Sequence, residues 1–300
     1  LRSPARRQAL HAPVSQGLGV PACEDTAAPP AWDGHGDDWW SSPPASPAEQ
    51  LIIRDALPSL RDDAPTRMLG RAIAAGTAAL EMELLRKLRT LPSAERSSKR
   101  LASVVNAAIE WKADNLSSSC QTAGGAPVLA ACHLDEGDWA TRFLVVALRS
   151  GTARGGHHVK IERTGSHDIV GLAKEANGEA RLRAFYYALL EEQSAALNEE
   201  SARTGTLLRT YEVFDMRGLT ARKVLSPVVL RFTRAQLEVV ARVYAGCTQR
   251  VAVINLPKWA AIPIRSLLDL LPSHVRQRVH VFSDDWGPFL KNDLDAASLA

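Results

Sequence analysis

The chain has 300 residues, 46% of them hydrophobic, which is enough to bury the core of one large domain or two small ones. Its net charge of +3 is too weak to indicate nucleic-acid binding, and no apolar run approaches the ~20 residues that a membrane-spanning helix needs. The four cysteines show no CxxC spacing, so we expect free thiols in a reducing compartment, with a Cys120–Cys132 disulfide as the alternative.

The first 48 residues are rich in proline, alanine and serine and show no hydrophobic periodicity. This composition predicts a disordered lead over residues 1–48. Within it, Trp39 and Trp40 are interpreted as an anchor that docks on the folded domain, in preference to a membrane or partner contact. Because the sequence begins at Leu1 rather than Met, organellar targeting is left open.

Residues 49–115 show the three-to-four-residue hydrophobic spacing of helices. We expect a short helix over Leu51–Leu60 that Pro58 breaks, a second over Met68–Leu91 and a third over Arg96–Trp111. Together these elements predict a small helical N-terminal subdomain over residues 49–115.

Residues 116–300 alternate short β-branched runs with amphipathic helical runs. The expected strands are Phe143–Leu148, His158–Arg163, Leu207–Met216, Val251–Ile254 and Val279–Phe282. The first two predict a hairpin about Gly151–Gly156, and each later strand follows a helix, which predicts a mostly parallel sheet. The expected helices are Asp168–Ala176, Glu179–Ser201, Leu225–Tyr244, Ala261–Leu271 and Asp284–Ala300.

Polar residues in this part of the chain form no catalytic or metal-binding motif. No GxSxG elbow or HExxH helix is present, so His157 and His158 are interpreted as a surface pair and Asp168 as a helix cap. Cys132 and His133 lie beside carboxylates, but a soft thiolate with hard oxygen ligands is a poor metal set. We therefore expect no enzymatic activity, no metal and no cofactor.

Several separated segments resemble, in their order and spacing, the CRAL-TRIO family of lipid-binding domains. They correspond to the family's "LLRFLRAR … WR" helices, its "GRPVxxxxxGxxD" hairpin and its "DxxGhs" and "iiNxP" strand ends. The segments are Leu84–Arg89 (LLRKLR) with Glu110–Lys112 (EWK), Gly155 with His157–Ile169 (HHVKIERTGSHDI), Phe214–Thr220 (FDMRGLT) and Val253–Pro257 (VINLP). The resemblance covers residues 84–300.

This resemblance implies an α/β fold with a mixed, mostly parallel sheet flanked by helices, a mobile lid helix over an apolar cleft, and a small all-helical subdomain before it. Residues 116–300 would form the lipid-binding domain, with its last strand missing, and the lid would be Ala261–Leu271. The family's function implies that the protein binds one hydrophobic ligand, a phospholipid or a similar lipid, and transfers it between membranes. We expect a cytoplasmic, peripheral monomer that touches membranes transiently through the nearly uncharged lid.

The ligand-binding residues that we expect from this alignment and from strand alternation are Thr210, Glu212, Phe214, Phe232, Ile262, Ile264, Leu267, Leu268, Leu271 and Arg278. Alternation puts Thr210, Glu212 and Phe214 on one face of their strand, and whether this face turns to the cleft or to solvent is left open. Inside the cleft, Glu212 would need a partner, either an internal arginine or a cationic headgroup. Asp215, at the strand end, is interpreted as a turn cap.

Two positions depart from the phosphoinositide-binding members of the family. Arg278 stands where they carry a lysine, and a guanidinium can serve a phosphate equally well. Gly246 stands where they carry an acidic residue, which puts phosphatidylinositol specificity in doubt. The alternative function is a degenerate CRAL-TRIO scaffold that binds a protein partner without transferring lipid. A hydrolase or phosphatase is least favoured, because the sequence has no nucleophile elbow and no Cys-x5-Arg loop.

Overall fold

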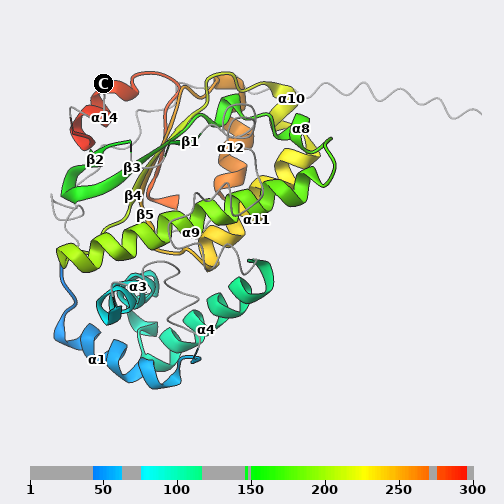
Figure 1. Cartoon of the computed structure of the whole chain (residues 1–300). Coiled ribbons are helices and arrows are strands. Elements are labelled where there is room, and N and C mark those ends of the chain that lie inside the picture. Colours follow the sequence, from blue (N-terminus) through cyan, green and yellow to red (C-terminus); the bar gives the residue numbers. More distant parts are fainter. Residues whose placement is uncertain (1–42, 63–75, 117–145, 148–149, 270–275, 296–300) are drawn as a thin grey trace, which may run out of the picture. The chain divides into compact units, whose positions relative to one another are not determined.

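The computed structural model describes residues 43–62, 76–116, 146–147, 150–269 and 276–295 (Figure 1). All of them belong to the unit that spans residues 40–300. Most of the predicted lead over 1–48, including Trp39 and Trp40, lies outside the described residues. So do Cys120 and Cys132, and the final residues 296–300.

The first described elements are helical, as the hydrophobic spacing predicts. They are α1 (Pro47–Ala56), η2 (Leu57–Ser59), α3 (Gly76–Thr90), η4 (Ser93–Glu95) and α4 (Ser98–Asn115). Helix α1 begins with a reciprocal capping box between Ser46 and Glu49, and it ends before the short 3-10 turn that contains Pro58. Helix α4 is capped by Ser97, which accepts a hydrogen bond from the backbone N–H of Arg100. It runs four residues beyond its predicted end.

The described strands form one sheet in the order β1-β3-β4-β5-β6, with β2 also paired to β3. Their bounds are β1 Val146–Ala147, β2 Thr152–Ala153, β3 His157–Glu162, β4 Thr210–Asp215, β5 Thr248–Ile254 and β6 Val279–Val281. β1 and β2 pair with β3 in antiparallel fashion, whereas β3, β4, β5 and β6 run parallel. The predicted mixed, mostly parallel sheet is therefore confirmed.

Helices fill the three connections between the parallel strands. They are η6 (Thr164–Ser166), α8 (Ile169–Leu172) and α9 (Gly178–Thr204), then α10 (Ala221–Val224) and α11 (Pro227–Arg242), then η7 (Lys258–Ala260) and α12 (Ala261–Leu268). Each parallel strand lies next to its successor, so these connections all step across the sheet in one direction. Right-handed crossovers that step the same way place their helices on the same face of the sheet. Figure 1 shows α9 and α11 along one side of the strands.

Local chemistry explains where the helix predictions differ from the structure. The helix expected over Leu225–Tyr244 is α11, which begins at Pro227, where the missing backbone N–H suits the first turn of a helix. The short α10 that precedes it was not expected. Helix α8 is shorter than the expected Asp168–Ala176, but Asp168 caps it, accepting from the backbone N–H of Gly171 at 2.9 Å. The predicted cap is thus confirmed.

The opposite face of the sheet is covered by α14 (Trp286–Asp293). Asp293 is fully buried and accepts hydrogen bonds from the Tyr211 hydroxyl at 2.9 Å and from Arg250 Nη1 at 2.5 Å. An isolated bridge between Ala153 and Leu294 joins the end of this helix to the β2 edge, beside which Figure 1 shows α14. These contacts use the odd-numbered side chain of β4, which leaves its even-numbered neighbours for the other face.

A buried ionic network joins the helical region to the sheet. Arg86 of α3 is fully buried and donates to Glu83 Oε2 at 2.6 Å, to the Asn198 side chain in α9, and to the backbone carbonyl of Leu208 at 3.0 Å. The predicted surface position of His157 is wrong, since this residue is also fully buried. Its Nδ1 accepts from the backbone N–H of Arg209 at 3.2 Å, because β3 lies inside the sheet.

We expect Arg86→Ala to lower the free energy of unfolding by about 3–5 kcal/mol, because it leaves Glu83 and the Leu208 carbonyl buried without their main donor. Urea denaturation at neutral pH measures this change. Arg203→Ala is the matched control. Arg203 lies in the last turn of α9, the helix that also carries Asn198, and its salt bridge with Glu200 is at the surface. Equal midpoints for the two variants would contradict the structural role given to Arg86.

Candidate functional site

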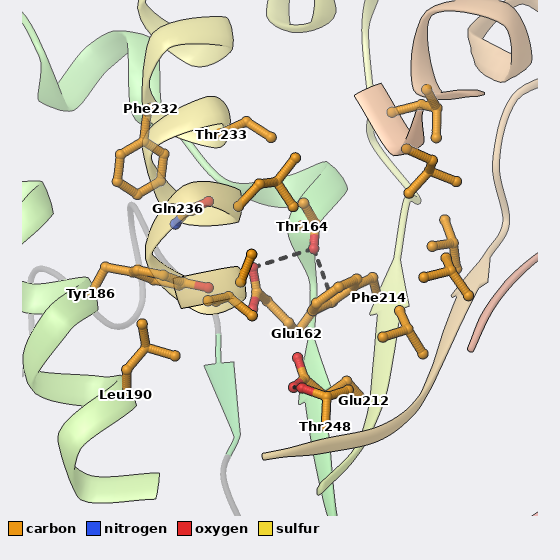
Figure 2. Close-up of a pocket in the computed structure, with 18 of the residues that line it drawn as sticks. Glu162, Thr164, Tyr186, Leu190, Glu212, Phe214, Phe232, Thr233, Gln236 and Thr248 are labelled. Carbon is orange, nitrogen blue, oxygen red and sulfur yellow. Dashed lines mark hydrogen bonds between the residues drawn. The ribbon is translucent and has the colours of Figure 1, made fainter. Parts of the chain in front are cut away.

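A cavity of about 260 Å³ lies between the strands and helices α9, α11 and α12. Figure 2 shows α9 and α11 facing the strands across it, with Leu190 and Phe232 turned inward. Most of its lining is aliphatic or aromatic, and its volume lies just below the ~300–1,000 Å³ usual for pockets that hold drug-sized ligands. The arrangement suits a small, mainly apolar molecule.

The register of the parallel strands builds the strand side of the cavity. Glu162 pairs with Phe214, which pairs with Val253, and all three line the cavity. Two residues earlier, Lys160 pairs with Glu212 in the same way. Since side chains alternate along a strand, Glu212 and Phe214 face the cavity, and the alternative in which Glu212 faces solvent is wrong.

A buried ion cluster lies at the strand side of the cavity. Lys160 Nζ lies 3.1 Å from Glu212 Oε2 and 3.3 Å from Glu162 Oε2. Glu212 Oε1 also accepts from the hydroxyls of Thr248 at 2.8 Å and Thr210 at 3.2 Å. Of the two partners left open for Glu212, an internal arginine and a cationic headgroup, the structure shows neither: the neighbouring strand supplies a lysine, because the parallel register places Lys160 beside Glu212.

The cluster keeps its charges although it is buried. Burial raises the pKa of the Glu212 carboxyl, but Lys160 and the hydrogen bonds from Thr248 and Thr210 lower it further, so the net direction is downward. Burial likewise lowers the pKa of Lys160, but the carboxylates of Glu212 and Glu162 raise it above its usual value. Both groups are thus ionised at neutral pH, and their attraction offsets the cost of removing them from water.

The helix side of the cavity presents polar groups of another kind. Tyr186 extends from α9 toward Glu162, and Gln236 lies on α11 (Figure 2). The Tyr186 ring packs edge-on against Phe232, with ring centroids 5.9 Å apart. Burial, with a smaller effect of the Glu162 and Glu212 carboxylates, raises the pKa of the Tyr186 phenol, so it keeps its proton. Within the described part of the chain, neither the Tyr186 hydroxyl nor the Gln236 amide hydrogen-bonds to protein.

Two cations line other parts of the cavity. Arg278 Nη1 donates to the backbone carbonyl of Thr248 at 2.9 Å, and Lys223 Nζ donates to that of Gly165 at 2.6 Å. Burial lowers the pKa of Arg278.

The glycine that replaces the family's acidic residue has a structural explanation. Gly246 has a φ of +84°, and a Cβ there would lie 2.8 Å from Arg86 Cγ and 2.9 Å from Thr90 Cγ2. A side chain at this position would collide with helix α3, so the close approach of α3 requires glycine.

The structure brings six of the ten predicted site residues to the cavity: Glu212, Phe214, Phe232, Ile264, Leu268 and Arg278. Thr210 lies behind the lining, where it bonds to Glu212 and accepts from Gln193 Nε2 at 2.8 Å. The predicted cavity position of Ile262 does not hold, because it lies on the outer side of α12 and is 73% exposed. The Leu267 side chain and Leu271 lie outside the described residues. Contact of any of these residues with a ligand stays a prediction.

Sequence reasoning missed Lys160, Glu162, Tyr186 and Gln236 as site residues. The only available signal for the first two was their shared parity in β3, which puts them on one face. The turn cap predicted for Asp215 is confirmed, since its Oδ1 accepts from the backbone N–H of Arg217 at 3.0 Å.

Residues 158–300 match the sequence model of the CRAL/TRIO domain. This part of the chain is a CRAL/TRIO domain. The matched region contains every strand and crossover helix that lines the cavity, so the family inferred from separated motifs is confirmed. Membership supports lipid binding or transfer as the general kind of function.

The fold agrees with this assignment. The crystal structure of Sfh5 superimposes with a TM-score of 0.59, over 83% of this chain and 85% of that chain, at 9% sequence identity. At such low identity the likeness shows the fold alone. A search of curated protein sequences gave no match.

No helix in the described ranges is long and apolar enough to cross a bilayer. Nor do the described residues contain a group of three or more histidine, cysteine, aspartate or glutamate side chains that could hold a metal ion.

We expect Glu212→Gln to lower the free energy of unfolding by about 1.5–3 kcal/mol at neutral pH, because Lys160 loses one of its two carboxylates. Since the folded-state pKa of Glu212 lies below the usual 4.5, its contribution is present above pH 4.5 and is lost as the pH falls through the folded-state value. The free energies of unfolding of the wild-type protein and Glu212→Gln, measured by urea denaturation, should therefore converge as the pH is lowered from neutral to acid. Glu238→Gln, at an exposed pair with Arg234, is the control, and a constant gap for Glu212→Gln would contradict the prediction.

Proposed function

We propose that this CRAL/TRIO domain acts by binding rather than by catalysis: it holds one hydrophobic molecule in the cavity and transfers or presents it at membrane surfaces in the cytoplasm. The observation that carries the proposal is an internal cavity with apolar walls and a small set of buried polar groups on the strand side. This is the composition of a ligand site, in which apolar contact supplies affinity and a few polar groups select the polar end.

The walls can supply most of the affinity. Phe232, Leu237, Val251, Val253, Ile264 and Leu268 all line the cavity. Each methylene that moves from water into such surroundings contributes about 0.8 kcal/mol, so a short alkyl chain is enough for stable binding. A ligand with one polar end suits this cavity, because the charged cluster of Glu162, Glu212 and Lys160 lies on the strand side and most of the remaining lining is apolar.

Helix α12 is suited to the role of a lid. Ile264 and Leu268 are four residues apart and line the cavity, so they share one face of the helix. On the outside, Ile262 is 73% exposed and the neighbouring Trp259 is 49% exposed. An aliphatic and an indole side chain exposed next to a cavity wall favour contact with the interfacial region of a bilayer.

Two observations favour the lipid carrier over the alternative of a degenerate scaffold. The missing acidic residue is one of the features that favoured a scaffold, and the packing of Gly246 against α3 gives this feature a structural reason. The cavity volume of about 260 Å³ is also not filled by the protein's own side chains, as a scaffold without a ligand would require.

Filling the cavity should block the ligand. Thr233 lines the cavity on α11, whereas its neighbour Arg234 points to solvent with 70% of its side chain exposed. We expect native mass spectrometry of the purified protein to show a bound lipid mass that Thr233→Trp loses and Arg234→Trp keeps. Circular dichroism would confirm that both variants fold. Retention of the same lipid by folded Thr233→Trp would place the ligand elsewhere.

Removing the outer apolar side chains of the lid should weaken membrane contact. We expect the Trp259→Ser and Ile262→Ser double variant to lose roughly tenfold or more in affinity for vesicles of phosphatidylcholine and phosphatidylserine, in a flotation assay, while it keeps its bound lipid. The matched control is Leu51→Ser, at a 48% exposed leucine on α1. If Leu51→Ser weakened vesicle binding as strongly, the membrane contact would not belong to α12.

A further inference from the structure

The polar side of the cavity carries an uneven balance of charge. Two carboxylates, Glu162 and Glu212, share the single ammonium group of Lys160, so these three side chains together carry one net negative charge. All three residues are buried, and the two glutamates line the cavity. A ligand group that enters this side meets carboxylate oxygens first, in surroundings where charges are poorly screened.

The two carboxylates differ in how fully they are satisfied. Glu212 accepts from Lys160, Thr248 and Thr210 at 2.8–3.2 Å. Glu162 has longer contacts: Lys160 at 3.3 Å, the Thr164 hydroxyl at 3.4 Å and Nδ1 of the buried His167 at 3.8 Å. A carboxylate has about four acceptor positions, so Glu162 can accept a further short hydrogen bond from the cavity.

Groups that can complete such a bond face Glu162 across the cavity. The hydroxyl of Tyr186 and the amide of Gln236 have no hydrogen-bond partner within the described residues, and each can both donate and accept. Figure 2 shows the Tyr186 ring extending toward Glu162. Both residues are partly buried and line the same largely apolar cavity, so their two unpartnered polar groups favour a ligand atom between them.

We propose that the ligand's polar end is a hydrogen-bond donor without negative charge, a hydroxyl or an amine, which donates to Glu162 and is contacted by Tyr186 and Gln236. This inference rests on the proposed function and adds the class of ligand. A carboxylate has no proton to give Glu162 at neutral pH, and a phosphate monoester has lost most of its second proton. Either group would place its charge beside two carboxylates whose one counter-ion is already shared.

Arg278 offers the competing position for an anionic headgroup. Its Nη1 is held by the Thr248 carbonyl, but its other N–H groups could meet a phosphate. Binding at Arg278 would make phosphate the preferred polar end. A site at Glu162 and a site at Arg278 therefore predict opposite orders of affinity for a phosphate and for a hydroxyl or amine.

Three probes of equal chain length separate these possibilities: hexadecanol, hexadecylamine and hexadecyl phosphate. Each is used to displace the neutral dye Nile red from the delipidated full chain. We expect hexadecanol or hexadecylamine to displace the dye at a concentration roughly tenfold lower than hexadecyl phosphate. The ratio of the displacing concentrations of hexadecanol and hexadecylamine identifies which donor the site prefers.

Variants tie the preference to the named residues. Tyr186→Phe removes one hydroxyl that bonds to no protein group, so it should fold normally and weaken the preferred probe about fivefold, while Tyr187→Phe, which does not line the cavity, changes nothing. Glu162→Gln should reduce the preference over phosphate, and Arg278→Gln should leave it unchanged.

Other outcomes overturn the inference in distinguishable ways. If hexadecyl phosphate displaces the dye best and Arg278→Gln abolishes this, the polar end is anionic and lies at Arg278. If all three probes displace equally, or Tyr186→Phe has no effect, the polar cluster does not select the ligand, and the proposed function still stands. If the dye and all probes fail to bind the folded protein, the proposed function itself is wrong.

Discussion

The ionic contact of the buried Lys160 with two carboxylates is the interaction on which the cavity depends. An ammonium group can lie beneath an apolar cavity only if carboxylates surround it, and β3 and β4 supply one each, with a hydroxyl from β5 bound to the second. The cluster therefore joins three adjacent strands through side chains as well as through backbone hydrogen bonds. It also gives an otherwise apolar cavity a side on which a polar group can be recognised.

The cavity exists because the crossover helices do not close completely on the sheet. All of them lie on one face, and α14 occupies the other through Asp293. Helix α3 limits one end of the cavity, since Thr90 lines it and Gly246 packs closely against Arg86. The helical region thus helps to form the cavity, and the glycine that departs from the family pattern is a consequence of that packing.

Patterns within single segments predicted much of this fold, and relations between segments were the part that they could not supply. Alternation predicted which residues of β4 share a face, and the break at Pro58 and the cap at Asp168 follow from local chemistry. The pairing of Lys160 with Glu212 depends on the register between β3 and β4, which no local pattern encodes. For the same reason the sequence did not show that Tyr186, on a helix with little amphipathic contrast, faces Glu162.

The position of helix α12 in the fold explains its apolar composition. Its apolar residues lie on two sides: Ile264 and Leu268 toward the cavity, Ile262 toward solvent. A helix that only covered the sheet would need one apolar side, and the exposed isoleucine carries a standing cost of about 25 cal/mol for each Å² of apolar surface in water. The proposed bilayer contact removes that cost at the moment when the inner side must leave the cavity. Under this proposal, a lid that is apolar on both sides links release of the ligand to the presence of a membrane.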